Sequence, residues 1–388
     1  MIPSPLPPDF IPFNKPYLVG PELKYIAEAV ALGKLSGNGI FTQRCQQFFE
    51  QVYGFRKALL TTSGTAALEM AALLLDLQPG DEVILPSFTF TSTANAFVLR
   101  GARIVFADSL PYHPNLDCSK VAKLITPRTR AIVPVHYAGV ACDMAPLLHL
   151  AQKHNLCLVE DAAQAIESTY QGQALGSIGQ LAAFSFHETK NIIAGEGGLL
   201  AINNPAFAER AEILWEKGTN RAAFFRGEVA RYQWVDIGSS YLPSELIAAY
   251  LWGQLGALES IQQRRYQQWQ RYYEALQPLA RQGCFTLPFV PDYARHNAHI
   301  FYLLCTSLEE RDALIRHLGQ HRILAVSHYQ PLHASPFYRA RHDGRPLPHA
   351  TAHAERLVRL PLYYELSLPE QQQVIAAVQS FYLGPCAR

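Results

Sequence analysis

Short apolar runs alternate with helical patterns between about residues 57 and 218. Continuous apolar runs of this length are typical of strands buried on both faces. The pattern predicts strands at 57–61, 82–85, 103–107, 131–136 and 156–160, separated by helices at 65–77, 91–100, 119–125 and 144–154. Strand–helix alternation of this kind predicts an α/β fold, with a mostly parallel sheet covered by helices on both faces.

The pattern then changes toward the C-terminus. Two more strands are predicted at 182–186 and 199–202, followed by a long helix at 244–277 that is rich in Leu, Gln and aromatic residues. We expect three parts: a mobile leader at 1–11, a large domain at 12–250, and a linking helix with a small domain at 251–388. The leader carries four prolines in its first eight residues and lacks the basic and apolar stretches of a signal peptide.

Composition narrows the class of protein. The chain has 388 residues, of which 49% are hydrophobic and 17% charged, so it can bury a large core. Its net charge of +1 argues against nucleic-acid and membrane-surface partners, which favour a basic field. The seven cysteines are scattered without a C-x-x-C pair, which favours reduced thiols in a cytoplasm over a disulfide framework.

Several common cofactor signals are missing from the sequence. There is no G-x-G-x-x-G after a strand and no phosphate-loop motif, which argues against dinucleotide enzymes and NTPases of that class. His317 and His321 are four apart on a predicted helix, and His296 lies near His299. Neither pair has a third ligand nearby, so solvated surfaces are favoured over metal sites.

Two segments at predicted strand ends carry candidate chemistry, because ligands of open parallel sheets bind beyond the carboxyl ends of the strands. Residues 62–67 read T-S-G-T-A-A and open a helix, which suits an anion site, although a plain helix cap is the ordinary alternative. Asp161 ends an apolar strand, where a partly desolvated carboxylate needs a cationic partner. A helix N-cap is the alternative there.

A third segment, 184–191, reads F-S-F-H-E-T-K-N and is followed by G-E-G-G. Lys190 lies just past a buried aromatic strand. A lysine whose pKa is lowered by its surroundings can form a covalent bond with an aldehyde; a snorkelling side chain is the alternative. Together the segments offer a lysine, an acid and an anion cradle. Pyridoxal phosphate needs these three groups for its aldehyde, ring nitrogen and phosphate.

The motifs S-G-T-A-A-L, P-S-F-T-F, E-D-A-A-Q and F-S-F-H-E-T-K-N with G-E-G-G, in this order, resemble the DegT-type sugar nucleotide aminotransferases over about residues 12–383. The resemblance implies the fold-type-I architecture of the aspartate aminotransferase fold, with a smaller C-terminal α+β domain. It also implies pyridoxal 5'-phosphate as cofactor and a homodimer with shared active sites.

The resemblance also implies roles for individual residues. Lys190 would hold the cofactor and later move protons, Asp161 would pair with the pyridine nitrogen, and Gln164 would bond the ring hydroxyl. Phe90 would stack on the ring, with an ordinary core aromatic as the alternative. His187 would line the cofactor or the sugar, with packing as an equal alternative. The backbone amides of Gly64 and Thr65, together with the Ser185 hydroxyl, would hold the phosphate.

One loop departs from the family pattern. Relatives often supply an asparagine to the phosphate from the partner subunit, whereas here the loop at 238–242 reads G-S-S-Y-L. Ser240 or Tyr241 would replace that asparagine, or Asn220 from the neighbouring loop. The contact across the dimer is therefore left open among these three.

Three longer strings indicate a substrate: E-K-G-T-N-R at 216–221, D-I-G-S-S-Y-L at 236–242 and H-Y-Q-P-L-H at 328–333. They are most similar to the branch of the family that serves enterobacterial common antigen synthesis. The implied reaction moves an amino group from L-glutamate to C4 of TDP-4-keto-6-deoxy-D-glucose, giving TDP-4-amino-4,6-dideoxy-D-galactose. Candidate substrate contacts are Lys34, Asn220, Arg221, His328 and His333.

Other functions stay open at this point. Amination at C3, of a UDP-linked sugar or of a cyclitol would use the same cofactor site, and a pyridoxal-dependent lyase would share its motifs. A non-catalytic regulator is disfavoured, because Lys190 is present. Some relatives that dehydrate sugars at C3 carry His at this position, so the lysine favours transamination.

Overall fold

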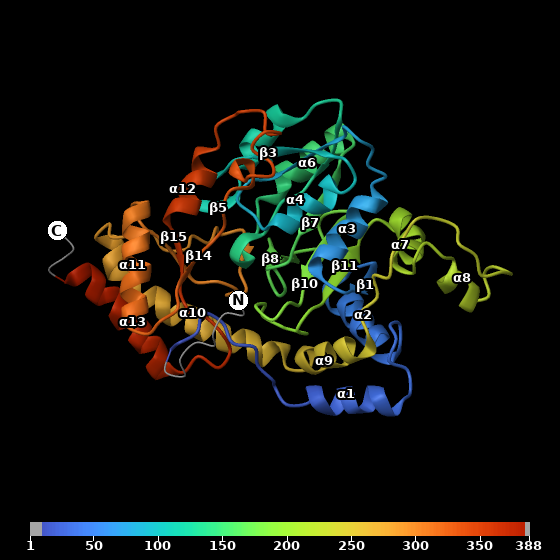
Figure 1. Ribbon diagram of the computed structural model, residues 1–388, viewed down its shortest axis with the longest axis horizontal. Helices are drawn as coiled ribbons and strands as arrows, with labels where there is room; N and C mark the ends of the chain where they lie inside the picture. The colour runs from blue at the N-terminus through green and yellow to red at the C-terminus, as the bar shows by residue number, and fades with distance from the viewer. Residues whose placement is uncertain (1–9, 385–388) are drawn as a thin grey trace.

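The computed structural model describes residues 10–384 (Figure 1). Residues 1–9 of the predicted leader lie outside the described residues, so its mobility stays a prediction. Ile11 is buried, and its N–H donates to the carbonyl oxygen of Arg322 at 2.8 Å. Leu324 N–H in turn donates to the carbonyl of Ile11 at 3.0 Å. Packing of the chain against its C-terminal part therefore already begins at Ile11.

A seven-stranded sheet forms the centre of the molecule, in the order β1-β11-β10-β7-β6-β2-β3. The neighbours from β10 to β3 are parallel, and β11 runs antiparallel to both β1 and β10. β11 reverses because it follows β10 through a loop without a crossover helix. The strands are β1 (Lys57–Thr61), β2 (Glu82–Pro86), β3 (Arg103–Ala107), β6 (Thr129–Ile132), β7 (Cys157–Asp161), β10 (Leu181–Ser185) and β11 (Gly198–Ile202).

Helices cover both faces of this sheet, which confirms the mostly parallel α/β architecture. Side chains of successive strand residues enter two different cores: Phe184 lies in one and Ala183 in the other. One core is closed by α2 (Ile40–Tyr53), α6 (Met144–His154) and α9 (Glu245–Leu255); the other by α3 (Gly64–Leu74), α4 (Thr91–Val98) and α7 (Ala208–Trp215).

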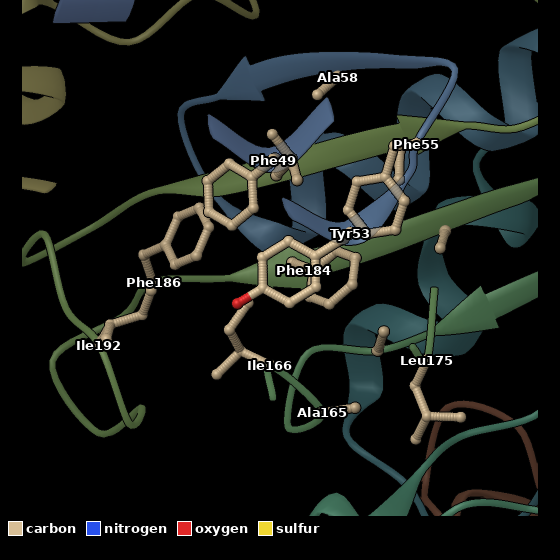
Figure 2. Close-up of a cluster of buried hydrophobic side chains, with 14 of the residues drawn as sticks. Phe49, Tyr53, Phe55, Ala58, Ala165, Ile166, Leu175, Phe184, Phe186 and Ile192 are labelled. Atoms are coloured by element: carbon tan, nitrogen blue, oxygen red, sulfur yellow. The ribbon is translucent and has the colours of Figure 1, made fainter. Parts of the chain in front are cut away.

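Aromatic rings fill the first core next to β10 (Figure 2). The ring of Phe49 in α2 stacks on Tyr53 and on Phe186, with centroids 5.7 and 5.5 Å apart. Phe55 packs against Phe184 at 5.5 Å. These contacts fix the position of β10 and of the chain that follows it, where the third motif begins.

The C-terminal part packs around a third hydrophobic cluster and a small antiparallel sheet of order β13-β15-β14. In Figure 1 it lies at the end of α10 away from α1. Its elements are α10 (Leu258–Arg281), β13 (Tyr302–Leu304), α11 (Leu308–Gln320), β14 (Val326–Ser327), α12 (Pro348–Arg356), β15 (Leu357–Arg359) and α13 (Leu368–Leu383). The domain limits at residues 12, 250 and 251 stay predictions.

Three predicted elements differ from the structure. The helix expected at 119–125 is a short α-helix at Cys118–Val121 followed by a 3-10 turn at Ala122–Leu124. The single helix expected at 244–277 is two helices, α9 and α10, because the chain leaves helical geometry at Ala257, with φ −111° and ψ 9°. The strand expected at 131–136 is the shorter β6, since Pro134 has no N–H to continue the ladder.

The remaining elements are short or lie at the edges. They are α1 (Glu22–Ala31), β4 (Ser109–Leu110), β5 (His113–Leu116), α5 (Cys118–Val121), β8 (Thr169–Tyr170), β9 (Gln173–Ala174), α8 (Arg221–Phe225) and β12 (Ala294–Arg295), with 3-10 turns at Ala122–Leu124, Tyr137–Gly139, Pro205–Phe207 and Leu332–Ala334. From residue 10 to 384, no helix is both long enough and apolar enough to cross a bilayer.

Candidate active site

A cavity of about 650 Å³ lies at the carboxyl ends of β1, β7 and β10. The three motif segments meet there: Gly64 follows β1, Asp161 ends β7, and Lys190 follows β10. The C-terminal part closes the cavity with His328, Tyr329 and Arg359. The cavity is therefore built from both parts of the chain.

Lys190 lies in the loop that follows β10, and its side chain lines the cavity. Burial lowers the pKa of Lys190 to about 8, because a desolvated ammonium loses hydration. The Asp161 carboxylate acts in the opposite direction, and the Arg359 guanidinium lowers the pKa further. The amine is thus far more often neutral at physiological pH than an exposed lysine would be.

Asp161 is 5% exposed and faces the same cavity. Burial raises the pKa of its carboxyl group, while a hydrogen bond from the Thr93 hydroxyl to Oδ2 at 2.7 Å opposes this rise. The N–H of Ala163 donates to Oδ1 at 3.2 Å. A carboxylate held and desolvated in this way is stabilised by a cation placed in the cavity.

The start of α3 offers backbone donors to the cavity. Ser63 caps the helix, and its hydroxyl accepts the N–H of Ala66 at 3.1 Å. The first N–H groups of a helix have no intrahelical acceptor, and the helix dipole favours an anion beside them. At Gly64 an added Cβ would lie 2.9 Å from Cβ of Ser185, so only glycine lets α3 approach the end of β10 this closely. The Ser185 hydroxyl therefore lies next to these donors.

Polar and aromatic side chains form the remaining walls. Gln164 accepts the N–H of Ala138 at 2.7 Å and donates to the Tyr329 hydroxyl at 3.2 Å, which fixes its amide. Phe90 is exposed along one side, with its ring centroid 6.0 Å from that of Tyr329. His328 Nδ1 lies 3.0 Å from the Tyr137 hydroxyl.

Eight of the predicted cofactor and substrate residues line this cavity, namely Gly64, Thr65, Phe90, Asp161, Gln164, Ser185, Lys190 and His328. His187 lines it too, with Nδ1 3.0 Å from the Thr189 hydroxyl.

Five predicted residues lie elsewhere in the single chain. Lys34 donates to the Asn38 carbonyl at 2.7 Å, and Asn220 to the Arg231 carbonyl at 3.0 Å. The other three are exposed or bound outside the cavity: Arg221 pairs with Glu216 at 3.4 Å, Ser240 is exposed, and His333 Nδ1 lies 2.7 Å from the Ser87 hydroxyl.

Ser240 and Tyr241, the two candidates of the loop at 238–242 for the phosphate contact, differ in exposure. Tyr241 is buried, and its carbonyl accepts the N–H of Thr62 at 2.9 Å. Ser240 is exposed beside it. Of the two, only the Ser240 side chain is exposed on the surface of the single chain.

Sequence reasoning missed several residues of the cavity. Thr93 lies one helical turn past P-S-F-T-F, and Tyr329 falls within H-Y-Q-P-L-H, yet neither was singled out. Arg359 ends β15, far from the motifs in sequence. The one available signal for Arg359 was a charge inside the apolar run L-V-R-L-P-L.

The cavity fits pyridoxal phosphate. It holds a buried amine of lowered pKa, a desolvated carboxylate that favours a cation, and a helix N-terminus packed through glycine against a serine. Among residues 10–384, by contrast, no group of three or more His, Cys, Asp or Glu side chains is arranged to hold a metal ion.

Comparisons with known proteins agree with this chemistry. The model of the DegT/DnrJ/EryC1/StrS aminotransferase family matches residues 17–379. The chain is 35% identical over 384 residues to the spore coat polysaccharide biosynthesis protein SpsC of Bacillus subtilis (strain 168), covering 97% of this chain and 98% of SpsC.

Two solved structures have the same fold over nearly the whole chain. S. venezuelae DesV, solved in complex with a ketimine intermediate, is 32% identical, with a TM-score of 0.87, and the match covers 96% of this chain and 98% of DesV. Spr1654 from Streptococcus pneumoniae, solved in its PLP form, is 26% identical with a TM-score of 0.88, covering 96% and 98%.

Proposed function

Because the chain belongs to the DegT/DnrJ/EryC1/StrS aminotransferase family, we propose that it moves an amino group from L-glutamate to C4 of TDP-4-keto-6-deoxy-D-glucose. Membership makes it a sugar aminotransferase of the fold-type-I class that depends on pyridoxal phosphate. The observation that carries the proposal is the buried amine of Lys190 in one cavity with Asp161. The cytoplasm is the proposed location.

Each residue of the cavity has a proposed part in the chemistry. Bound pyridoxal phosphate supplies an aldehyde for amines and a ring that takes up the electrons released at the donor carbon. Lys190 Nζ would hold the cofactor and, as a free amine, would accept the proton from the donor carbon. The buried carboxylate of Asp161 would keep the ring nitrogen protonated, and the Thr93 hydroxyl orients that carboxylate.

Other groups place the cofactor. The N–H groups of Gly64 and Thr65 and the Ser185 hydroxyl, which line the cavity at the start of α3, would hold its phosphate. Gln164, fixed by Ala138 and Tyr329, bonds the ring hydroxyl. Phe90 covers one ring face. Lys190 then returns the proton at the acceptor carbon when the keto sugar takes the amine.

The sugar is proposed from the strings at 216–221, 236–242 and 328–333. They support TDP-4-amino-4,6-dideoxy-D-galactose as product, within the synthesis of enterobacterial common antigen. His328 is the substrate candidate that lines the cavity in the single chain. The alternative within the same family is amination at C3 or of a UDP-linked sugar.

We further propose a homodimer with shared active sites. The segment around α8 extends from the body of the chain (Figure 1) and exposes apolar rings, with Trp234 80% and Phe225 72% exposed. A second copy would cover these rings. The same contact would bring Ser240, Asn220 and Arg221 toward the neighbouring cavity, with Lys34 beside them.

The test offers TDP- and UDP-linked 4-keto and 3-keto sugars with L-glutamate and identifies the product by NMR. The proposal expects amination at C4 of the TDP sugar, with the Lys190→Ala variant inactive as control. Amination of a UDP sugar alone, or at C3 alone, would contradict the substrate assignment and favour the alternative.

A further inference from the structure

His299 lies buried next to the lysine cavity. It follows β12 and is 5% exposed, so the solvated surface that the sequence favoured for it is wrong. His299 lines a small space that shares several residues with the main cavity, among them Gln164, Ser185 and Lys190. It is not among the described residues that line the main cavity itself. Any effect of His299 on the chemistry must therefore pass through another residue.

The hydrogen bonds of Asn191 settle which ring nitrogen of His299 carries the proton. Asn191 Nδ2 donates to the Asn297 carbonyl at 2.7 Å and to Gln262 Oε1 at 3.1 Å. These two bonds use both N–H groups of the amide, so its Oδ1 is an acceptor. His299 Nδ1 lies 2.8 Å from that oxygen and must carry the hydrogen. The Asn191 side chain is thus held at three points.

The imidazole of His299 donates this hydrogen bond without carrying a charge. Burial lowers the pKa of His299 well below its ordinary value. Nearby basic groups lower this pKa further, those of Lys190, Arg265, Arg359 and His328. A cationic donor at this position would disfavour the ammonium form of Lys190. The neutral ring instead supplies the hydrogen bond and leaves the charge balance around Lys190 unchanged.

The hold on Asn191 matters because Asn191 follows Lys190 directly in the chain. The Tyr17 hydroxyl donates to the Asn191 carbonyl, and the Lys190 N–H donates to the His187 carbonyl at 2.8 Å. Within residues 10–384, Lys190 Nζ makes no hydrogen bond or ion pair of its own. The direction of the amine therefore depends on how the backbone beside it is held.

Asn297 connects this network to a second loop of the cavity. Its Nδ2 donates to the carbonyls of Gln164 and Ile166 at 2.8 and 2.7 Å. The His299 N–H donates to Asn297 Oδ1 at 3.1 Å. One short segment, 297–299, thus bonds both the loop after β10 and the loop after β7.

We propose that His299 is a positioning residue for Lys190: its Nδ1–H fixes Asn191, and Asn191 fixes the direction in which the lysine amine enters the cavity. The inference rests on the proposed function, in which that amine reacts with the aldehyde of pyridoxal phosphate. The rate between two held groups depends steeply on geometry, and a displacement of about 1 Å can cost about 100-fold. Loss of the donor at His299 should therefore slow the amine without changing its pKa.

The experiment compares His299→Leu with His299→Asn. Leucine keeps much of the bulk and removes the donor, whereas the asparagine amide places an N–H where Nδ1 was. Absorbance after mixing apoprotein with pyridoxal phosphate measures the rate of cofactor capture, and steady-state assays of the holoenzyme give kcat and KM for L-glutamate. We expect His299→Leu to lower the capture rate and kcat about tenfold or more, and His299→Asn to stay within about threefold of the native protein. KM should change less than about threefold in both, since His299 does not contact the donor.

His353→Leu is the matched control. His353 is 3% exposed, and its Nε2 donates to the Leu110 carbonyl at 2.8 Å, but it is not among the described residues that line the Lys190 cavity. Because a buried hydrogen bond is lost in each case, stability should fall in His353→Leu and in His299→Leu. The capture rate should fall only in His299→Leu.

The pH dependence of capture supplies a readout that a loss of stability would not give. The capture rate of His299→Leu should still level off above about pH 8, because the substitution removes a neutral group and leaves the pKa of Lys190 in place. A group that exchanged protons with the lysine would instead change the shape of the profile when removed.

Three results would overturn the inference. They are a native capture rate in His299→Leu, an equal loss in His299→Leu and His299→Asn, and a plateau of the pH profile that moves in His299→Leu. If His299→Leu does not fold, His299→Gln takes its place, because its amide lies one bond farther out and misses the Nδ1 position.

Failure of the proposed function looks different. A native protein that captures pyridoxal phosphate but aminates no sugar nucleotide would refute the sugar assignment. The comparison of capture rates uses neither sugar nor L-glutamate, so it would still decide the role of His299.

Discussion

At the residue scale, two effects act on Lys190 in opposite directions. Burial lowers its pKa, and the Asp161 carboxylate raises it, with burial the larger effect. Asp161 shows the reverse balance: burial raises its pKa, and the hydrogen bond from Thr93 lowers it. The Asp161 carboxylate therefore opposes the neutral form of the Lys190 amine, and the Thr93 hydroxyl favours the ionised form of Asp161.

The lowered pKa of Lys190 predicts the pH dependence of cofactor capture by the apoprotein. The neutral amine is the reacting form, so the rate should rise tenfold per pH unit below the pKa and level off above about 8. A lysine with the ordinary value of 10.5 would keep gaining rate up to about pH 10. Absorbance after mixing apoprotein with pyridoxal phosphate measures the profile, with a small free amine as control. A rise that continues past pH 9.5 would rule out the shift.

Thr93 predicts a second effect at this scale. Thr93→Val removes the hydrogen bond to Asp161 Oδ2 and should raise the carboxyl pKa further. A bond to a charged group is worth about 1.5–3 kcal/mol, so kcat should fall about tenfold or more. Thr89→Val is the matched control, because Thr89 is as buried as Thr93. The Thr89 hydroxyl is hydrogen-bonded to the Thr93 hydroxyl at 2.8 Å and not to Asp161. Equal losses in the two variants would contradict the role of Thr93.

Asp161 and Lys190 could be singled out from the sequence because a charge at the end of an apolar strand is conspicuous. Thr93 carries no such signal, and the charge of Arg359 inside an apolar run does not by itself reveal which cavity it lines. Arg359 lines the cavity because β15 pairs with β13 in the small C-terminal sheet. Thr93 lies in the first turn of α4, where threonine is common and indicates no particular function. Their contributions depend on tertiary contacts between segments far apart in the chain.

At the scale of elements, the approach of α3 to β10 creates the phosphate cradle. Gly64 is the residue of closest contact, with Ser185 on the strand side. Strands β1 and β3 have the bounds that the sequence predicts, since their apolar runs are sharply limited. Helices α1 and α2 were not predicted, because their sequences mix polar and apolar residues and are stabilised by contacts with α9.

Gly64→Ala tests this element contact. The added Cβ would lie 2.9 Å from Ser185 Cβ and 3.2 Å from the Phe184 carbonyl, so α3 must shift away from β10. We expect cofactor affinity to fall about tenfold or more, as helix donors move from the phosphate. Gly319→Ala is the control: Gly319 lies in α11 with open space around its Cβ position, and the change should stabilise the fold by about 0.5–1 kcal/mol. Unchanged cofactor affinity in Gly64→Ala would refute the cradle.

At the scale of the whole molecule, one chain builds a cavity from its two parts and leaves several predicted substrate residues outside it. Lys34, Asn220, Arg221 and Ser240 all lie away from Lys190 within the chain. A second copy that covers the exposed rings around α8 would place them at the neighbouring cavity. The family resemblance implies such an arrangement, but the hydrophobic and polar pattern of one chain does not specify it, because it depends on a surface match between two folded copies.

Co-expression of two inactive variants tests the shared site. Lys190→Ala lacks the amine, and Ser240→Glu would place a negative charge against the phosphate of the neighbouring subunit. Each homodimer should be inactive, while random mixed dimers carry one intact site and should restore about a quarter of native activity. Activity is measured on the mixture and again after tandem purification of the doubly tagged mixed dimers, which should then show about half of native activity, because each carries one intact site of two. An active Ser240→Glu homodimer, or no recovery in the mixed dimer, would contradict the shared site.

The most direct test of the central claim is chemical labelling of the cofactor-bound lysine. The holoenzyme is reduced with borohydride, which makes the link between lysine and cofactor permanent, and the digest is mapped by mass spectrometry. The account predicts a pyridoxyl group on Lys190 and its absence from that peptide when L-glutamate is added before reduction. A label on a different lysine, or none on any peptide, would contradict it.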